Sequence, residues 1–158
     1  MIQRIQSVYL AIAAIVTIVL LFIPIGYIYT ADAQYVFTCF SVKLVPPATG
    51  VVMSTLWIAF GLIVSAVMSV VAIFMYKDRM KQVRLVSLNM LVFLIAVVLM
   101  VWLYPDVLFA RKNIIGIEDY FKFNMWVMVF IFPPIGMFLA NRAIRSDEKK
   151  VRAADRLR

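Results

Sequence analysis

Hydrophobic residues are gathered into four long blocks along the chain, separated by short polar segments. The blocks run from about Val8 to Tyr29, Met53 to Tyr76, Leu85 to Tyr104 and Tyr120 to Ala140. Each has close to the roughly 20 residues that an α-helix needs to cross the hydrocarbon core of a bilayer. Because no block has an acidic residue in its interior, the pattern predicts four transmembrane helices.

The first block also has features of a cleaved signal peptide. Arg4 precedes it, and Ala31-Asp32-Ala33 resembles a cleavage site. Its apolar stretch of about 22 residues is longer than the 7–15 residues of a signal-peptide core. We therefore expect an uncleaved signal anchor.

The loop from Thr30 to Val52 is the longest connection between the first three blocks. Its residues from Tyr35 to Leu44 are rich in β-branched and aromatic side chains, which suit a strand. The stretch from Thr30 to Gln34 suits the turn of a hairpin with residues 25–29. The loop is therefore expected to carry a small β element.

Basic residues are distributed unequally between the two sides of the predicted membrane. Twelve of the sixteen lie at the N-terminus, between the second and third blocks, and after the fourth. The other four are Lys43, Arg111, Lys112 and Lys122. The positive-inside rule then places both termini and the middle loop in the cytoplasm.

The tail from Asn141 to Arg158 is predicted to be a cytoplasmic helix, with Ser146 as its N-cap before Asp147 and Glu148. Anionic lipid head groups attract such a basic helix. The alternative is an acidic partner, either a cytoplasmic protein or ribosomal RNA, although no RNA-binding motif is found. The candidate docking residues are Arg142, Arg145, Lys149, Lys150, Arg152, Arg156 and Arg158.

Small residues recur at every fourth position of the second block, at Gly61, Ser65 and Ser69. This spacing lets two helix backbones approach closely in lipid. We expect packing against the first or third helix of the same chain, with a partner subunit as the alternative. Asn89 is expected to bond to a neighbouring helix; a solute-binding role is the alternative.

Pro133 and Pro134 fall near the middle of the fourth block. Prolines deprive the preceding turn of hydrogen-bond donors, and such breaks can line transport sites. Transport sites usually also have ionisable groups within the membrane, which these blocks lack at depth. A structural kink is therefore the preferred interpretation.

The amino-acid composition excludes several kinds of metal, cofactor and catalytic sites. The chain has no histidine and a single cysteine, Cys39, so it lacks the ligands for haem, iron–sulfur clusters or zinc and the partners of a Ser–His or Cys–His pair. No cofactor, metal or catalytic residue is predicted. Cys39 is expected to be buried in the outer β element, with pairing to another chain as the alternative.

The two ends of the chain have recognisable motifs. The start reads Met1-Ile2-Gln3-Arg4-Ile5-Gln6, and the end reads ANRAIR, then DEK and ADRLR. In these motifs, its length and its four blocks, the chain resembles a family of small four-helix inner-membrane proteins of Bacteroidota that is a domain of unknown function. The resemblance implies a location and a fold but no activity.

Together these features predict one all-α membrane domain: a four-transmembrane-helix bundle with a small β element and a basic cytoplasmic helix. With 65% hydrophobic and 15% charged residues, a soluble domain is excluded. The expected function is a non-enzymatic accessory or scaffold subunit of a bacterial inner-membrane assembly, for which a secretion or translocation complex fits. The membrane-protein partner is not identified. The alternatives are a small channel or transporter, and a lipid-acting enzyme using Asp106, Glu118 and Asp119.

Overall fold

The computed structural model describes residues 3–30, 33–45, 50–102 and 120–156. Within these ranges the chain forms four α-helices, one 3₁₀ helix, five strands of four residues each, and a π-helical turn at residues 99–102 that continues α3. In chain order they are α1 (Gln3–Leu20), β1 (Gly26–Tyr29), β2 (Gln34–Phe37), β3 (Ser41–Leu44), β4 (Val51–Ser54), α2 (Leu56–Phe74), α3 (Arg79–Val98), β5 (Tyr120–Phe123), η2 (Met125–Ile131) and α4 (Phe132–Arg156).

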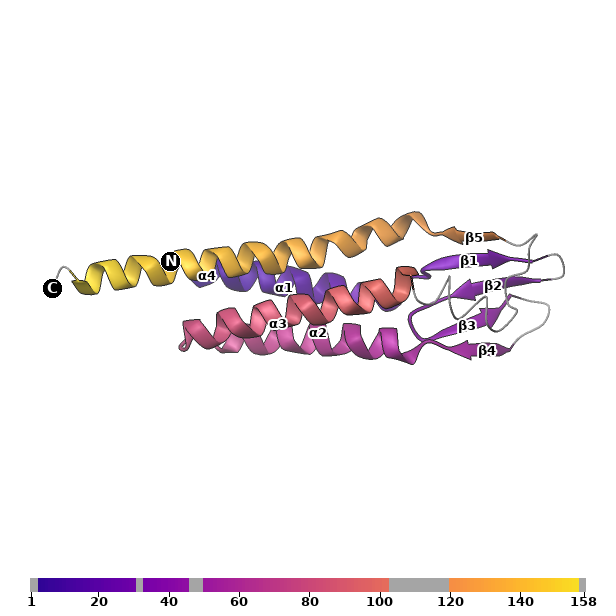
Figure 1. Cartoon of the computed structure of the whole chain (residues 1–158), viewed down its shortest axis with the longest axis horizontal. Helices are drawn as coiled ribbons and strands as arrows, with labels where there is room; N and C mark the ends of the chain where they lie inside the picture. The colour runs from indigo at the N-terminus through magenta and orange to yellow at the C-terminus, as the bar shows by residue number, and fades with distance from the viewer. Residues whose placement is uncertain (1–2, 31–32, 46–49, 103–119, 157–158) are drawn as a thin grey trace.

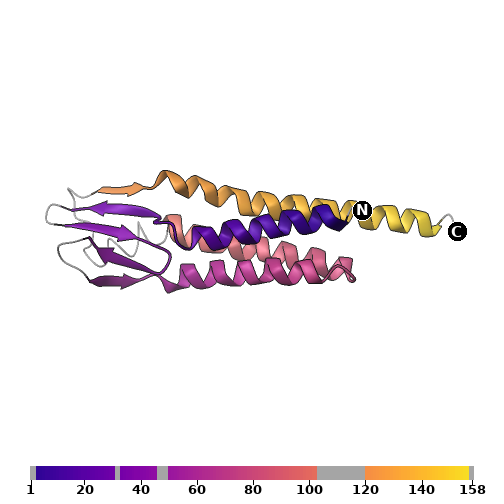
Figure 2. The same ribbon diagram turned by 180° about the vertical axis from the view of Figure 1, so that it is seen from behind.

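The four α-helices lie side by side, and the strands form a sheet at one end of them (Figures 1 and 2). Around the group, α1 packs against α2, α2 against α3, α3 against α4, and α4 against α1. Both ends of the chain lie away from the sheet (Figures 1 and 2). The molecule therefore has a sheet end and a terminal end.

The sheet is antiparallel throughout, with the strand order β4-β3-β2-β1-β5. Its last strand comes from a distant part of the chain, since Gly26 of β1 lies opposite Phe123 of β5. Gly26 is needed for this pairing, because a Cβ atom there would lie 2.6 Å from the Phe121 ring and 2.8 Å from the Lys122 carbonyl oxygen. The Phe121 ring also meets the ring of buried Phe37 edge-on, with centroids 6.1 Å apart.

The prediction of an all-α fold is wrong, because the sheet makes this a mixed α/β structure. The predicted first and fourth helices include residues 26–29 and 120–123, which instead form β1 and β5. Hydrophobic content misled here, because a short apolar run suits a buried strand as well as a helix.

The predicted β element in the first loop is present, but its long strand is divided. The expected hairpin joins β1 to β2. The stretch from Tyr35 to Leu44 turns back at Thr38, whose hydroxyl donates to the Ser41 carbonyl at 2.7 Å and accepts from the Ser41 N–H at 3.1 Å. A side chain that bonds the backbone three residues later stabilises a turn and ends the strand.

Three helical segments are long and apolar enough to cross a membrane: Leu56–Phe74, Arg79–Trp102 and Met125–Val151. Large apolar side chains are exposed on all four helices; Ile12, Phe60, Leu91 and Phe138 are each more than half exposed. Continuous exposed apolar surface of this kind is typical of contact with lipid or another protein.

The first apolar helix is shorter than expected, spanning Ile5–Leu20. Its last turn tightens, with the Leu21 and Phe22 N–H groups bonding the carbonyls of Ile18 and Val19. Pro24 follows, and proline cannot continue a helix. The remaining apolar residues of the block therefore enter the sheet rather than a span.

The fourth helix runs without interruption through Ser146, so the predicted separate tail helix with an N-cap at Ser146 is wrong. No glycine or proline follows Gly136, and buried Ala140 and Ile144 continue the packing into the tail. Pro133 and Pro134 lie in the first turn of α4, directly after η2. There the Phe132 N–H donates to the Val129 carbonyl, a 3₁₀ bond that replaces the one that Pro133 cannot make.

Candidate functional site

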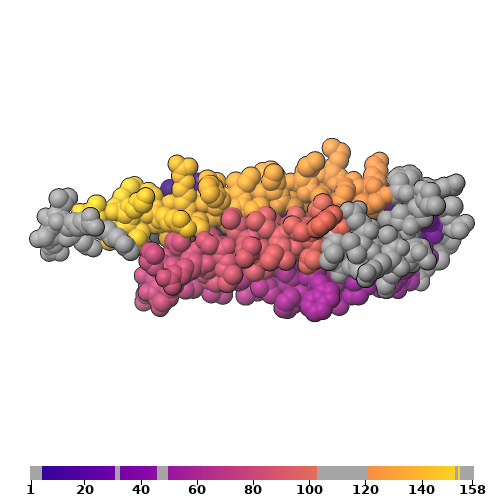
Figure 3. All heavy atoms as spheres, in the orientation of Figure 1, coloured from indigo at the N-terminus to yellow at the C-terminus, as the bar shows by residue number. Residues whose placement is uncertain are grey.

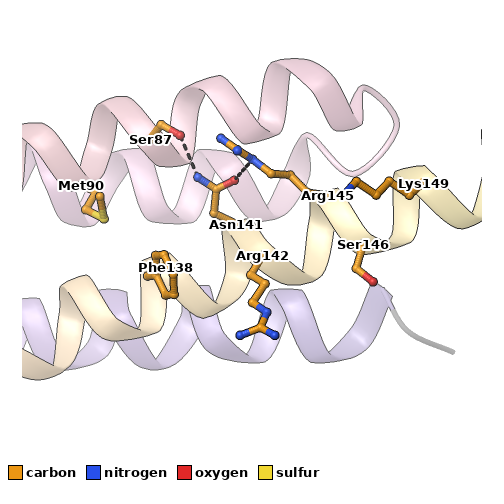
Figure 4. A pocket seen from close by; sticks show the side chains of 8 residues that line it. All are labelled: Ser87, Met90, Phe138, Asn141, Arg142, Arg145, Ser146 and Lys149. Atoms are coloured by element: carbon orange, nitrogen blue, oxygen red, sulfur yellow. Dashed lines mark hydrogen bonds between the residues drawn. The ribbon is translucent and has the colours of Figure 1, made fainter.

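The most distinctive surface lies between α3 and α4 near the terminal end. Figure 3 shows the face on which these two helices lie side by side along their lengths. An open groove of about 550 Å³ lies between them (Figure 4). It is lined by Ser87, Met90, Phe138, Asn141, Arg142, Arg145, Ser146 and Lys149.

A chain of hydrogen bonds joins the two helices across this groove (Figure 4). The Arg145 Nε–H donates to Asn141 Oδ1 at 3.0 Å, and Asn141 Nδ2 donates to the Ser87 hydroxyl at 2.7 Å. Asn141 therefore holds Arg145 on one side and α3 on the other. The bond to Asn141 uses only Nε, so the two terminal nitrogens of the guanidinium keep their donors for a ligand.

The groove is positively charged. Arg142, Arg145 and Lys149 are spaced three and four residues apart, which places them along one face of α4. Figure 4 shows Arg145 turned toward Asn141 and α3, whereas Arg142 extends from the other side of α4, so the two guanidinium groups point apart. No acidic side chain is among the lining residues.

The nearest buried acidic group is already paired. Asp147 is 9% exposed, and its Oδ2 lies 3.4 Å from Arg79 Nη1 at the start of α3. This ion pair fastens α4 to the first residue of α3. It also uses the carboxylate that would otherwise offset the charge of the groove.

A second, apolar groove of about 250 Å³ lies closer to the sheet, between α3 with the residues that follow it to Val101 and η2 with the start of α4. Met90 and Phe138 end the basic groove, and Phe93, Leu94 and Pro134 begin the apolar one. Its other lining residues are Val97, Met100, Val101, Val127, Met128, Phe130 and Ile131. The α3–α4 surface is thus basic and polar near the terminal end and apolar toward the sheet.

Comparison with known proteins places the whole chain in one family. The model of a domain of unknown function, DUF4293, matches residues 2–157. The chain belongs to this family. No curated protein matches it. The resemblance inferred from the two ends of the chain to an uncharacterised family is confirmed, and the match covers the helices and the sheet alike.

The family's description names no activity, so the predicted docking residues are judged from geometry alone. The structure brings Arg142, Arg145 and Lys149 to the basic groove and leaves Lys150 exposed outside its lining. Arg152 and Arg156 belong to the last turns of α4. Arg158 and the three acidic residues Asp106, Glu118 and Asp119 lie outside the described residues.

The small-residue face of α2 packs within the chain, against α3. A Cβ atom on Gly61 would lie 3.0 Å from the Cβ of Ala96. Ser65 and Ser69 are fully buried, and the Ser69 hydroxyl accepts from Asn89 Nδ2 at 2.7 Å. Asn89 therefore bonds a neighbouring helix, as expected, while its Oδ1 and the Ser65 hydroxyl have no hydrogen-bond partner among the described residues.

Cys39 is fully buried where β2 and β3 turn toward the end of α1. Its Sγ donates to the Leu20 carbonyl at 3.6 Å. Burial raises the pKa of the thiol from 9.0 to about 12, so the group stays protonated at physiological pH. A buried neutral thiol fits the predicted packing role and disfavours pairing with another chain.

Two contacts at the site could not be read from the sequence. Ser87 and Asn141 are 54 residues apart, and Arg79 and Asp147 are further apart still. The only sequence signal was the place of Ser87 and Asn141 just at the edges of apolar blocks. Polar residues there suit the membrane interface, but nothing in the spacing pairs them.

Proposed function

We propose that this protein is a non-enzymatic accessory or scaffold subunit of a bacterial inner-membrane assembly. In this proposal all four helices lie in the bilayer, both termini are cytoplasmic, and the sheet faces the opposite side. A protein secretion or translocation complex is the example that best fits a basic inner face combined with an outer sheet.

The membrane placement is supported by the distribution of exposed side chains. Exposed apolar residues are dense on the helices up to about Phe74 on α2, Leu88 on α3 and Leu139 on α4; beyond these positions the exposed large apolar residues of α3 and α4 are Met80 and Val151. Basic residues begin immediately beyond these positions, with Arg84 and Arg142 both exposed. This change from apolar to basic surface favours a cytoplasmic membrane interface at the terminal end.

The observation that carries the scaffold role is the projecting end of α4. Asp147 pairs with the first residue of α3, so the residues after it extend past the turn between α2 and α3 (Figures 1 and 2). From Asp147 to Arg156 the helix continues for about 14 Å. This segment includes Lys149, Lys150, Arg152 and Arg156, whose charges suit an acidic partner surface.

The sheet supplies a second surface at the other end. It is tied firmly to the helices: the Thr55 hydroxyl, just before α2, donates to the Thr38 carbonyl at 2.9 Å, and the Asn124 N–H, just before η2, donates to the Ile25 carbonyl at 2.9 Å. A partner bound to the sheet would therefore be held rigidly relative to the helices. Two firmly connected surfaces on opposite faces are what a scaffold requires.

The test compares full-length protein with a truncation after Lys150, which removes the projecting turns but keeps the basic groove. Both proteins would be purified in mild detergent after in-cell crosslinking, and their partners identified by mass spectrometry. We expect normal membrane levels and loss of a cytoplasmic partner. As a matched control, full-length protein with Lys77→Gln and Lys81→Gln removes two exposed charges from the α2–α3 turn and should keep the partner.

If the truncated protein keeps every partner at unchanged salt resistance, the docking role of α4 is wrong. Orientation is tested separately in a Cys39→Ser background. Single cysteines at Gly50 and at Ser146, both exposed, are treated with a membrane-impermeant thiol reagent on cells with a permeable outer membrane. Labelling at Gly50 and not at Ser146 is expected, and the reverse pattern would reject the proposed topology.

A further inference from the structure

We propose that the surface between α3 and α4 binds one anionic phospholipid. The phosphate lies in the basic groove against Arg145, with Lys149 one turn further along α4, and the acyl chains follow the apolar groove toward the sheet. The assignment rests on the bilayer placement proposed above, but it does not depend on the scaffold role.

The head-group end of this site is charged and has room for a ligand. Its lining includes three cationic side chains, two hydroxyls and one amide, with no carboxylate. Its volume of about 550 Å³ is that of a small-molecule site. Basic pockets between transmembrane helices on the cytoplasmic side are suited to phosphate-bearing lipid head groups.

Arg145 is held in position before any ligand arrives. Its Nε bonds Asn141, and Asn141 in turn bonds Ser87 on α3, so these bonds orient the exposed side chain toward α3. Beyond this bond, the structure joins Arg145 to no other described residue by a hydrogen bond or ion pair. Because Arg145 is exposed and its bond to Asn141 uses only Nε, its terminal nitrogens are accessible to a phosphate group, whose geometry a guanidinium matches.

The apolar end extends through most of one membrane leaflet. From Phe93 to Val101 the apolar groove rises about 12 Å, and half of the hydrocarbon core is about 15 Å. The groove is lined by aliphatic, aromatic and thioether side chains along this whole length. A head group at Arg145 would therefore place its acyl chains beside Phe93, Val97 and Val101.

This continuity favours a phospholipid over a soluble phosphate. A free phosphate ester would use the basic groove and leave the apolar groove without an occupant. A transmembrane helix of a partner would fill the apolar groove, but it would need an acidic residue of its own at the depth of Arg145 to use the basic groove as well. A phospholipid supplies both parts in one molecule, with the charge and the chains in the order that the two helices present.

The experiment uses purified full-length protein in nanodiscs of phosphatidylcholine, and native mass spectrometry measures retained lipid as phosphatidylglycerol is titrated in. We expect preferential retention of one phosphatidylglycerol. Arg145→Gln should weaken it by about tenfold. Lys150→Gln, which removes the same charge from the same helix outside the groove, should change it by less than about twofold. Circular dichroism and monodispersity confirm that each variant is folded.

A second variant, Val97→Trp, tests the acyl-chain part without altering any charge. The larger side chain fills the apolar groove and should reduce retention of phosphatidylglycerol while leaving binding of glycerol phosphate unchanged. Equal weakening by Arg145→Gln and Lys150→Gln would show general electrostatic attraction and overturn the site. The site would also be overturned if phosphatidylcholine were retained as strongly as phosphatidylglycerol, or if glycerol phosphate competed at the concentration of the lipid. Unchanged retention of phosphatidylglycerol by Val97→Trp would overturn it as well.

Discussion

The two sides of α3 are built differently. Against α2, it packs small residues at close range, with Gly61 facing Ala96 and a buried bond between Asn89 and Ser69. Against α4 and η2, it is hollowed by the basic groove and the apolar groove, and its polar contacts among the described residues are confined to the terminal end. One face of the helix is closed by the protein itself, whereas the other leaves space.

This difference shows which helix interface stabilises the protein through close packing. Close backbone approach and a buried side-chain bond stabilise helix pairs in lipid, where apolar contact with lipid itself is no worse than contact with another helix. The α2–α3 interface therefore holds the helices together, and the α3–α4 interface is the one available to a ligand. Matched substitutions on the two sides of α3 can separate these roles.

Adding a larger side chain should have the largest effect on stability, and this effect should differ most between the two sides of α3. Gly61→Leu inserts a side chain where even a Cβ atom would lie 3.0 Å from Ala96, so we expect the free energy of unfolding to fall by about 1–3 kcal/mol. Val97→Phe adds bulk on the grooved side and should change it by less than about 1 kcal/mol. Thermal unfolding in mild detergent measures both. Equal losses would contradict the distinction.

Removing a hydroxyl from each interface provides a smaller, closely matched comparison. Ser69→Ala leaves the buried Asn89 amide without its acceptor, and we expect a loss of about 1 kcal/mol. Ser87→Ala removes the acceptor of partly buried Asn141, which water or a head group can replace, so the loss should be below about 0.5 kcal/mol. The ranking fails if Ser87→Ala is the more destabilised protein in the same unfolding assay.

The ion pair at the terminal end should contribute still less. Asp147→Asn removes the partner of Arg79, and because both side chains retain some solvent contact we expect a loss of about 0.5 kcal/mol that diminishes in high salt. Asp78→Asn is the control, since its pair with Lys81 is mostly exposed and should contribute nothing measurable. Unfolding midpoints at low and high salt separate the two. A salt-independent loss in Asp147→Asn would point to packing instead.

The sheet end should show no reaction at all with a thiol reagent. The pKa of Cys39 is raised to about 12 in the folded protein, so the thiol stays neutral and buried from pH 7 to pH 9, where an unfolded thiol already ionises. Between about 9 and 12 only the unfolded form loses the proton, so rising pH should destabilise the fold. Alkylation followed by mass spectrometry measures the labelling of the Cys39 thiol from pH 7 to pH 9, with denatured protein as the positive control. Rapid labelling at pH 8 would show that the turn opens.

Much of the helical part was predictable because its signals are local. The apolar blocks located the ends of α2 to within three residues and those of α3 to within six, and the spacing of Gly61, Ser65 and Ser69 indicated a packing face. Of the two strands within the apolar blocks, β5 at the start of the fourth block was missed, whereas β1 was expected both as the end of the first helix and as one side of a hairpin. Their β-branched and aromatic residues are equally hydrophobic in a helix, and only pairing with a distant strand distinguishes the two.

The candidate site was likewise predictable from the sequence only in part. Spacings of three and four residues are enough to put Arg142, Arg145 and Lys149 on one helix face. That the face borders a groove depends on Ser87, which reaches it only because α3 packs beside α4. The sequence identified the charged residues, but it could not show the basic groove that they line.

By itself, the sequence determined the apolar blocks, the unequal charge and the absence of histidine chemistry, because each follows from composition and short-range order. Only the tertiary structure decided that β5 closes the sheet beside β1, that α2 rather than α4 packs tightly on α3, and that Asn141 holds Arg145 over a groove. These outcomes depend on contacts between segments tens of residues apart. Such contacts depend on which surfaces are complementary in shape and chemistry, and local periodicity does not indicate that complementarity.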